Sequence, residues 1–400
     1  MELLSSSLRE RTLDATLKYA LQKAAELNIT RVTDTTLLDQ IGIPVFTSIR
    51  PGGNSLCVNS GKGFTVNEAK IGAFMEAIEY AYAEYGYANK PLAMVSVAEL
   101  IKQMPPGFQF EDFALLFGKT AKLNEMIACI ECQHLQDEHH YLIPAQLVFI
   151  PFRENPGVLL FCSTTNGLAS GNSVEEATLH AICELIERDI TSFNIVKDET
   201  LWVDVEQSTS KIIAMKEKIE AAGLTLSLRY AHNPFGLAYF EAFVIDDFNS
   251  DFTAISGGNG SHPNKEIAAV RAIAEAVQSR LTAIHGGRDD IIDHVKQHDQ
   301  FNESKKLDTY LKKKQQILDR RDGIVFNDIA ELPRSATIDQ ALQQITECLA
   351  KNGMNDIFRY IFTEPGDNLH VVKIVVPKLE HFDEKSKRIG PRLLSHIINE

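Results

Sequence analysis

Apolar residues recur along the chain at two spacings, one typical of helices and one typical of strands. Near the N-terminus, apolar residues at helical spacing predict a helix over residues 8–27. Residues 30–50 contain the apolar run Ile-Gly-Ile-Pro-Val-Phe and end in Arg-Pro-Gly-Gly, which predicts a strand, a turn and a strand. Residues 338–351 predict an amphipathic helix, and residues 371–376 a buried strand. Together these elements predict an α/β fold, α+β in the broad sense, with mixed or antiparallel sheets covered by helices.

A unit that combines a short apolar strand, a glycine-rich turn and a helix occurs three times. The strands are expected at residues 55–60, 158–162 and 252–256, and the turns contain Gly61, Gly167 and Gly257. The helices share the pattern Ala-x-x-Glu-x-(Ile/Val)-(Glu/Gln), which occupies residues 73–79, 181–187 and 272–278. Such a repeat is hard to obtain by chance, so it predicts one site built from three equivalent helices.

The acids of the first two copies fall on one face of each predicted helix. Positions 8 and 11 residues beyond a starting position lie about 80° and 20° from it around a helix. This geometry groups the acids into two sets: Glu68, Glu76 and Glu79 in the first copy, and Glu176, Glu184 and Glu187 in the second.

Two carboxylates three residues apart on a helix lie side by side and repel each other unless they share a cation or a proton. Clustered carboxylate oxygens suit Mg²⁺, which keeps some of its waters and completes its shell with substrate phosphates. Acids among Ala, Ile and Leu are also costly without a partner. Any one such pair is more often a solvated helix face, but three copies favour a magnesium and nucleotide site.

The glycine segments are expected to supply the phosphate-binding half of that site. Small residues let backbone N–H groups approach a phosphate ahead of a helix N-terminus. No segment closes a spaced glycine motif with Gly-Lys-Ser/Thr, so none is a P-loop. Charge balance calls for cations near a triphosphate, and five basic side chains lie within or just beyond the repeats: Lys62, Arg188, Arg271, Arg280 and Arg288.

Composition narrows the class of protein. The chain has 400 residues, of which 44% are hydrophobic and 24% charged, as in ordinary globular proteins. Its formal net charge of −14 would repel a phosphate backbone, so nucleic acid is not an expected partner. The sequence shows no signal peptide and no apolar run long enough for a membrane span, which predicts a cytoplasmic protein without membrane attachment.

The cysteines predict no disulfide framework, and only Cys129 and Cys132 have a spacing that resembles a metal site. Their segment otherwise predicts a hairpin, with strands over residues 127–132 and 141–148 around a polar turn. Residues three apart in a strand point to opposite faces, so these two thiolates would not converge on one ion. The plain hairpin is therefore favoured over a zinc site.

The expected organisation has four parts. Residues 1–54 form an N-terminal helix and strands, and residues 55–290 form the ATP-binding core with the three repeats. Residues 291–335 are a polar helical excursion, because residues 296–322 are strongly charged. Residues 336–400 return to the same domain as a helix and a strand.

From Arg31 to Arg392 the sequence resembles the YcaO family. The most specific pieces are Gly61-Lys-Gly with residues 75–79, residues 167–172 with residues 183–188, and residues 275–280 ahead of residues 287–290. The resemblance implies a fold with a central cleft for ATP and several Mg²⁺ ions. It also implies transfer of the γ-phosphate to a backbone amide oxygen of a peptide or protein, followed by azoline or thioamide formation and loss of phosphate.

The resemblance also implies residue roles. Metal ligands would be Glu76, Glu79, Glu176, Glu184 and Glu187, and the nucleotide would meet Lys62, Asn172, Glu176, Arg188, Glu275, Gln278 and Arg280. Glu187, Arg188 and Arg280 would take part directly in the phosphoryl transfer. Such chemistry needs positioning and charge neutralisation more than a protein nucleophile.

Two departures from the family pattern bear on the site and the product. Gly72 stands where a relative can carry a serine near the nucleotide. Azoline-forming relatives often end in Pro-x-Pro-x-Pro, whereas this sequence ends Ser-His-Ile-Ile-Asn-Glu and looks more like members that form thioamides with a TfuA-type partner. The expected assembly is a homodimer, with a TfuA-like or leader-binding partner protein delivering the substrate.

Two other functions stay open at the level of sequence. The first is a nucleotide-binding regulatory or accessory protein with the same fold and no amide-modifying activity. The second is a different ATP-grasp or kinase-like ligase, because the absence of P-loop and kinase signatures does not by itself exclude one.

Overall fold

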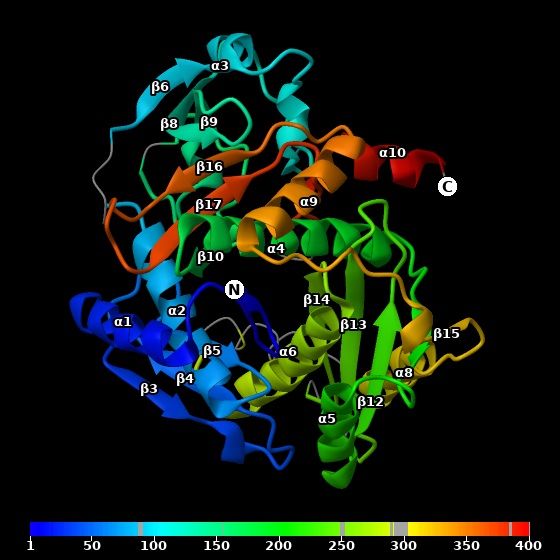
Figure 1. The fold of residues 1–400 in the computed structure, drawn as a ribbon. Helices are drawn as coiled ribbons and strands as arrows, with labels where there is room; N and C mark the ends of the chain where they lie inside the picture. The colour runs from blue at the N-terminus through cyan, green and yellow to red at the C-terminus, as the bar shows by residue number, and fades with distance from the viewer. Residues whose placement is uncertain are drawn as a thin grey trace. The chain divides into compact units, whose positions relative to one another are not determined.

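The computed structural model describes residues 1–86, 91–154, 156–248, 253–288, 291, 303–383 and 386–399. The chain divides into two compact units (Figure 1). Unit 1 comprises Met1–Ala77 and Glu199–Arg334, and unit 2 comprises Ile78–Asp198 and Ser335–Glu400. The first division falls inside helix α2 (Val66–Ala83), so one helix carries residues of both units. The core that the sequence suggests, residues 55–290, is divided between the two units, because residues 78–198 belong to unit 2 and the rest of this range to unit 1.

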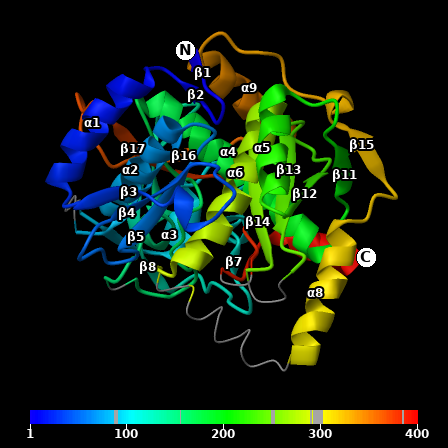
Figure 2. The ribbon, with the colours of Figure 1, turned by 90° about the horizontal axis from the view of Figure 1, so that it is seen from below.

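Unit 1 is built on a five-stranded sheet in the order β14-β13-β12-β11-β15. Its strands are β11 (Leu201–Asp204), β12 (Thr225–Tyr230), β13 (Ala238–Ile245), β14 (Ile255–His262) and β15 (Gly323–Val325). All neighbours are antiparallel except the parallel pair of β11 and β15. Helix α6 (Lys265–His285) packs along β13 and β14, and α5 (Ser210–Ala221) packs against α6 and β12 (Figure 2).

A second sheet of unit 1 is antiparallel and contains β3 (Arg31–Asp34), β4 (Val45–Ile49) and β5 (Val58–Lys62). Helix α6 also contacts β5. Alanines such as Ala268, Ala269 and Ala272 are fully buried in the apolar core of this unit, which lets α6 lie close to the strands.

The N-terminus corrects one sequence prediction. Helix α1 spans Leu13–Glu26 rather than starting at Leu8, because Thr12 caps it by accepting a hydrogen bond from the Ala15 N–H. Leu8–Arg9 instead forms the short strand β2, which pairs with β1 (Glu2–Leu3). A 3₁₀ turn at Thr36–Leu38 separates β3 from β4, in the expected strand, turn and strand order.

The charged segment after the third repeat contains a helix. Helix α8 (Glu303–Ile317) has mostly exposed side chains where these are described, whereas residues 292–302 lie outside the described residues. After α8 the chain returns to unit 1 through β15 and the 3₁₀ turn Phe326–Asp328. Phe326 and Ile329 are buried in the core of the unit. This stretch is therefore structural, because its apolar residues complete the sheet and its core.

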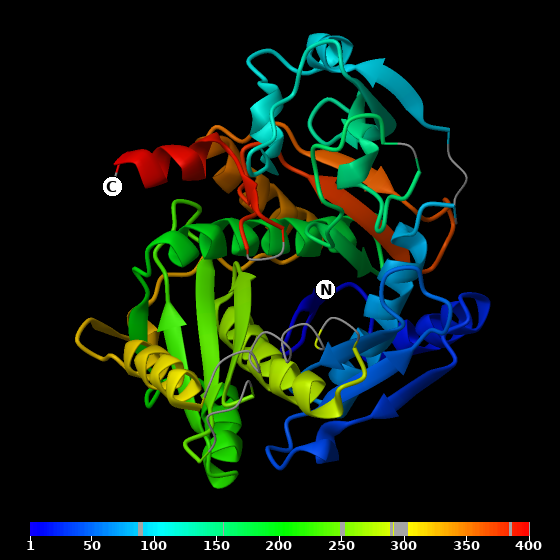
Figure 3. The same cartoon turned by 180° about the vertical axis from the view of Figure 1, so that it is seen from behind.

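Unit 2 contains the sheet β10-β17-β16-β8-β6, with β9 paired to β8 (Figure 3). Its strands are β6 (Ala93–Ser96), β8 (Met126–His134), β9 (His140–Pro144), β10 (Leu168–Gly171), β16 (Phe358–Ile361) and β17 (His370–Val375). Helix α4 (Val174–Val196) packs on β10 and β17, and α9 (Ile338–Lys351) packs on α4. The bounds of α9 agree with the sequence prediction, and β17 begins and ends one residue earlier than predicted.

Smaller elements complete unit 2. They are α3 (Val97–Gln103), α10 (Pro391–Asn399), the 3₁₀ turns Phe110–Phe113 and Ala145–Leu147, and the strand pair β7 (Leu115–Leu116) and β18 (Arg388–Ile389). Cys129 and Cys132 lie buried in β8 of the predicted hairpin with β9. Burial raises the pKa of the Cys129 thiol to about 12, which favours the protonated thiol over a metal-binding thiolate.

All three repeats are present, but the strands of the second and third are not where the sequence suggests. The strand before α4 is β10, and residues 158–162 form no strand. The other two strands, β5 and β14, include the glycines themselves. Each repeat is therefore a glycine-containing strand followed directly by its helix.

Gly61 and Gly257 lie in strands β5 and β14 rather than in the expected turns, whereas Gly167 lies in a turn before β10, and glycines of β5 and β14 serve strand–helix packing. A Cβ on Gly61 would lie 2.0 Å from the Ala73 N, and one on Gly258 would lie 2.3 Å from the Ala276 N. No Cβ fits at such distances, so only glycine lets these helices approach their strands this closely. In the described part of the chain, no helix is long and apolar enough to cross a bilayer.

Candidate nucleotide and magnesium site

Four of the predicted site residues of unit 1 gather around strand β5. The Ser60 N–H donates to Glu76 Oε2 at 3.0 Å, and Gln278 Nε2 donates to the Ser60 carbonyl at 2.8 Å. The Lys62 Nζ forms an ion pair with Glu275 Oε2. We call Lys62, Glu76, Glu275 and Gln278 the β5 cluster, because β5, α2 and α6 present these side chains together.

The electrostatics of the β5 cluster suit a bound cation. Burial raises the pKa of Glu76, and the neighbouring Glu275 raises it further, whereas Arg288, the Ser60 N–H and Lys62 act in the opposite direction. A carboxyl group with a raised pKa is relieved by a proton or by a metal ion. Two carboxylates beside one lysine, partly withdrawn from water, therefore form a donor set that fits Mg²⁺.

The predicted residues of unit 2 gather at the start of α4 and along its first half. Asn172 Nδ2 lies 3.1 Å from both carboxylate oxygens of Glu176, and the Ser173 Oγ caps the helix by accepting from the Glu176 N–H. Ser170 Oγ donates to Glu79 Oε1 at 2.5 Å. These contacts fix Asn172 and Glu176 at the N-terminus of the helix, where the helix dipole favours anions.

The second helix buries its last predicted ligand. Glu187 is 3% exposed, and its Oε1 lies 3.8 Å from the Arg188 guanidinium. Glu184, one turn earlier, is partly buried. A carboxylate so far out of water needs a strong partner, which a metal ion supplies. We call Glu79, Asn172, Glu176, Glu184, Glu187 and Arg188 the α4 cluster.

Arg280 stands apart from the β5 cluster. Its guanidinium is 6% exposed and pairs with Asp39 at 3.0 Å and Asp246 at 3.3 Å, and it also donates to the Thr253 carbonyl. These bonds tie α6 to the segments around it. In the part of unit 1 that the structure describes, Arg280 therefore helps to position α6.

Sequence reasoning missed three contributors. Ser60 and Ser170 hold the carboxylates of Glu76 and Glu79, and neither belongs to the helical pattern that revealed the acids. Lys373, in β17, is 2% exposed, and burial lowers its pKa to about 7 while the nearby Glu184 carboxylate acts to raise it. The only signal for Lys373 in the sequence is a single charge within an apolar strand.

Among the described residues, no three or more His, Cys, Asp or Glu side chains are arranged to hold a metal ion by themselves. The carboxylates of the two clusters come instead in small groups with serine, asparagine and lysine partners. Mg²⁺ usually binds through one or two carboxylates, with substrate phosphates and water completing its shell. The donor sets of both clusters are of this kind.

Comparison with known proteins identifies a family that binds ATP and Mg²⁺. Residues 60–380 match the family model described as YcaO cyclodehydratase, ATP- and Mg²⁺-binding. A protein of Methanothermobacter thermautotrophicus is 32% identical over 389 residues, which cover 96% of this chain and 97% of that protein. A Rhizobium leguminosarum bv. trifolii protein from the tfuA 3′ region is 31% identical and covers 89% of this chain and 84% of its own length.

Solved structures show the same fold. The YcaO protein of Methanopyrus kandleri, bound with AMPPCP and Mg²⁺, superposes with a TM-score of 0.72 at 18% identity and covers 96% of both chains. A heterocyclase in complex with substrate and cofactor superposes with a TM-score of 0.76 at 19% identity and covers 98% of this chain and 56% of its own. The acids that the repeat pattern revealed lie within the matched residues, and this chain belongs to the YcaO family of ATP- and Mg²⁺-binding enzymes.

Proposed function

We propose that this enzyme uses ATP and Mg²⁺ to phosphorylate a backbone amide oxygen of a peptide or protein, and that the activated amide becomes a thioamide. The observation that carries the proposal is the pair of carboxylate clusters within a chain of the YcaO family. Both clusters consist of acids withdrawn from water beside a cation, which is the electrostatic setting that a metal–triphosphate complex requires.

The residues then take distinct roles. Glu76 and Glu275 of the β5 cluster, and Glu79, Glu176, Glu184 and Glu187 of the α4 cluster, would hold Mg²⁺. Bound Mg²⁺ would neutralise charge that develops on the phosphates during transfer. Lys62 and Arg188 would meet phosphate oxygens, and Asn172 would orient Glu176 through its two hydrogen bonds.

Arg280 and Gln278 would position other parts of the site and would not contact the phosphates. Gln278 donates to the Ser60 carbonyl, and Glu76 accepts from the Ser60 N–H. Helices α6 and α2 are thus both hydrogen-bonded to the same residue of β5. Arg280 anchors α6 through two carboxylates. In this proposal Arg280 keeps α6 in register and does not contact the transferred phosphate.

In the proposed reaction, the amide oxygen attacks the γ-phosphorus and ADP leaves. A sulfur nucleophile then adds to the amide carbon, and the C–O bond breaks to release inorganic phosphate. The amide oxygen thus leaves in the phosphate, and a C=S bond remains. The relative from the tfuA 3′ region supports the thioamide product and a TfuA-like partner, whereas the heterocyclase fold supports azoline formation as the other product of the same activation.

The proposal is tested by labelling the backbone amide oxygens of a candidate peptide with ¹⁸O and analysing the phosphate formed. Candidate peptides would be those encoded beside the gene, supplied with a TfuA-like partner protein where one is encoded there. Labelled phosphate that depends on peptide, ATP and Mg²⁺ is the expected result. Glu187→Gln should abolish it, whereas Glu347→Gln, an exposed change in α9, should not. ATP binding without any peptide-dependent turnover would instead indicate a regulatory protein.

A further inference from the structure

Strand β14 forms one edge of the five-stranded sheet of unit 1 (Figure 1). It pairs with β13 along its whole length, from Ile255 to His262, and the described part of the chain places no strand on its outer side. Backbone groups on the open side of an edge strand can pair with another chain. The outer edge of β14 is therefore a candidate surface for binding an extended peptide.

The register of β14 identifies the residues whose backbone groups point outwards. The Asp246 N–H donates to the Ala254 carbonyl at 2.7 Å, so Ala254 faces β13. Residues of an antiparallel strand alternate between those bonded to the partner strand and those directed away from it, so the N–H and C=O groups of Gly257 and Asn259 point outwards. Gly257 is exposed and Asn259 partly exposed, and these backbone groups have no hydrogen-bond partner among the described residues.

Strand β5 of the first repeat packs on its helix in the same way as β14. A Cβ on Gly61 would lie 2.2 Å from a carbonyl oxygen of α2, and one on Gly260 would lie 2.1 Å from a carbonyl oxygen of α6. Both glycines also precede the helical Ala-x-x-Glu pattern by the same number of residues. Asn259, the residue before Gly260, is thus the equivalent of Ser60, the residue before Gly61.

The two equivalent positions differ in what their backbone groups bind. The Ser60 N–H donates to Glu76, and the Ser60 carbonyl accepts from Gln278. These two side chains occupy the outward groups of Ser60 and close the edge of β5. In the described part of unit 1 no side chain does so at Asn259, which leaves a donor and an acceptor together on an open edge.

The open edge of β14 lies beside the β5 cluster. A Cβ on Gly258 would lie 2.6 Å from the backbone carbonyl carbon of Glu275, so this part of β14 packs directly on the turn of α6 that carries Glu275 and Gln278. Glu275 in turn forms the ion pair with Lys62. A chain bound along this edge would therefore run next to carboxylates that are proposed to hold Mg²⁺.

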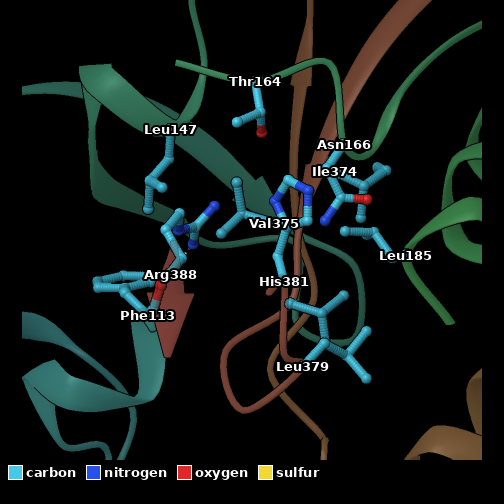
Figure 4. Close-up of a pocket in the computed structure, with 11 residues that line it drawn as sticks. Phe113, Leu147, Thr164, Asn166, Leu185, Ile374, Val375, Leu379, His381 and Arg388 are labelled. Atoms are coloured by element: carbon cyan, nitrogen blue, oxygen red, sulfur yellow. Dashed lines mark hydrogen bonds between the residues drawn. The ribbon is translucent and has the colours of Figure 1, made fainter. Parts of the chain in front are cut away.

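The pocket beside β17 in unit 2 offers no comparable site (Figure 4). Asn166, His381 and Arg388 contribute its polar lining, and its volume of about 30 Å³ admits about two water molecules. A peptide does not fit there, whereas a strand edge can pair with an extended chain of any length.

We propose that the peptide or protein substrate binds as an added strand along the outer edge of β14, with the Asn259 N–H and C=O paired to one of its residues. Such pairing draws its affinity from main-chain hydrogen bonds. Alternate carbonyl groups of an added strand point away from β14, so an amide oxygen beside the paired residue is free to receive a phosphate. That the occupant is the substrate rests on the proposed function, whereas the open edge follows from the register of β14.

The test follows hydrogen–deuterium exchange of residues 255–262 in the full chain, read by mass spectrometry with and without peptide. The probe is a pool of random decapeptides at millimolar concentration, because main-chain pairing requires no particular side chains. We expect the Gly257 and Asn259 amides to exchange more slowly when the pool is present. A fully N-methylated pool, which has no backbone N–H donors, is the matched probe and should give no protection. Equal exchange with and without the unmethylated pool would overturn the inference.

Two substitutions at one residue separate the backbone from the side chain. Asn259→Pro removes the outward N–H but no bond to β13, a change that the edge of a sheet tolerates. Asn259→Ala keeps the N–H and removes only the side-chain amide. Affinity for the pool, measured from the protection of Gly257, should fall about tenfold or more in Asn259→Pro, because a hydrogen bond is lost and its partner carbonyl is left unpaired. It should stay unchanged in Asn259→Ala, and equal affinities of the two variants would contradict strand addition. The N-methylated pool tests the same pairing in the unmodified chain should the proline variant not fold.

The outcome separates the strand edge from the proposed function. The exchange measurement requires neither ATP nor metal, so Glu187→Gln should show the same protection as the unmodified chain. Protection without phosphate release from any candidate peptide would preserve the strand site and contradict amide phosphorylation. Release of labelled phosphate by Asn259→Pro at an unchanged KM for the peptide would preserve the proposed function and overturn the strand site.

Discussion

The second and third repeats share one architecture and differ in chemistry. In both, a strand packs so closely on the following helix that a Cβ on one glycine cannot fit: Gly171 lies against Ala177, and Gly258 against Ala276. The second helix ends its pattern in the buried Glu187, whereas the third ends it in Gln278, which is a hydrogen-bond donor to β5. Packing and chemistry are therefore set by different residues of the same unit, and each can be altered without the other.

The largest expected effect is the loss of ATP turnover when Glu187, the acid that distinguishes the second repeat from the third, is replaced. Glu187→Gln converts its pattern to that of the third repeat and removes a proposed metal ligand. Mg²⁺-dependent ATP turnover should fall on the order of 100-fold or more, because loss of even a supporting contact at a metal site commonly costs 10- to 100-fold. Steady-state ADP release measures this effect. An unchanged rate would remove Glu187 from the site.

Packing is tested by adding one methyl group at each of two neighbouring glycines of β14. Gly258→Ala should destabilise unit 1 by about 2–3 kcal/mol, because the new Cβ meets backbone atoms of α6 that cannot move away. Gly257→Ala is the control, since its Cβ would lie 3.3 Å from the Phe243 ring. Urea unfolding should separate the two, and equal free energies of unfolding would refute the close-packing argument.

The opposite substitution, Gln278→Glu, introduces into the third repeat the acid that the second repeat carries at the equivalent position. Gln278→Glu removes the donor to the Ser60 carbonyl and places a negative charge beside it. A cost of about 1–3 kcal/mol is expected for the lost bond and the unsatisfied carbonyl. Thermal unfolding at neutral pH measures it. A more stable variant would mean that a cation, and not an amide, is preferred at this position.

A further expected effect is a change of stability with pH in unit 2. Burial lowers the pKa of Lys373 to about 7 in the folded state, below its ordinary value of 10.5. Between these two values the unfolded chain holds more protons, so this lysine makes the folded state more stable as pH rises. The stability of the unmodified chain relative to Lys373→Met should therefore increase from pH 7 to pH 9, by at most about 1.4 kcal/mol per pH unit. Parallel stability curves would contradict the shift.

Periodicity made much of the fold predictable. The helix Ile338–Lys351 and the strand pairing of β8 with β9 were readable because apolar spacing along the chain directly reflects which face is buried. The N-terminal helix was predicted five residues too early, because the capping Thr12 decides its start and the preceding apolar residues pair as strands instead. Gly61 and Gly257 are expected in turns but lie in strands, because the sequence shows that a Cβ is absent and does not show which backbone atoms occupy the space.

For the site, the sequence by itself determined the acids and their repetition, because Ala-x-x-Glu-x-(Ile/Val)-(Glu/Gln) places carboxylates on one helical face wherever the helix lies. Tertiary structure alone decided their partners: Ser60 for Glu76, Ser170 for Glu79, and two aspartates that hold Arg280 away from the β5 cluster. It also brought Asn166, His381 and Arg388 around one pocket. Contacts between distant residues depend on how strands and helices pack, and local periodicity carries no record of that packing.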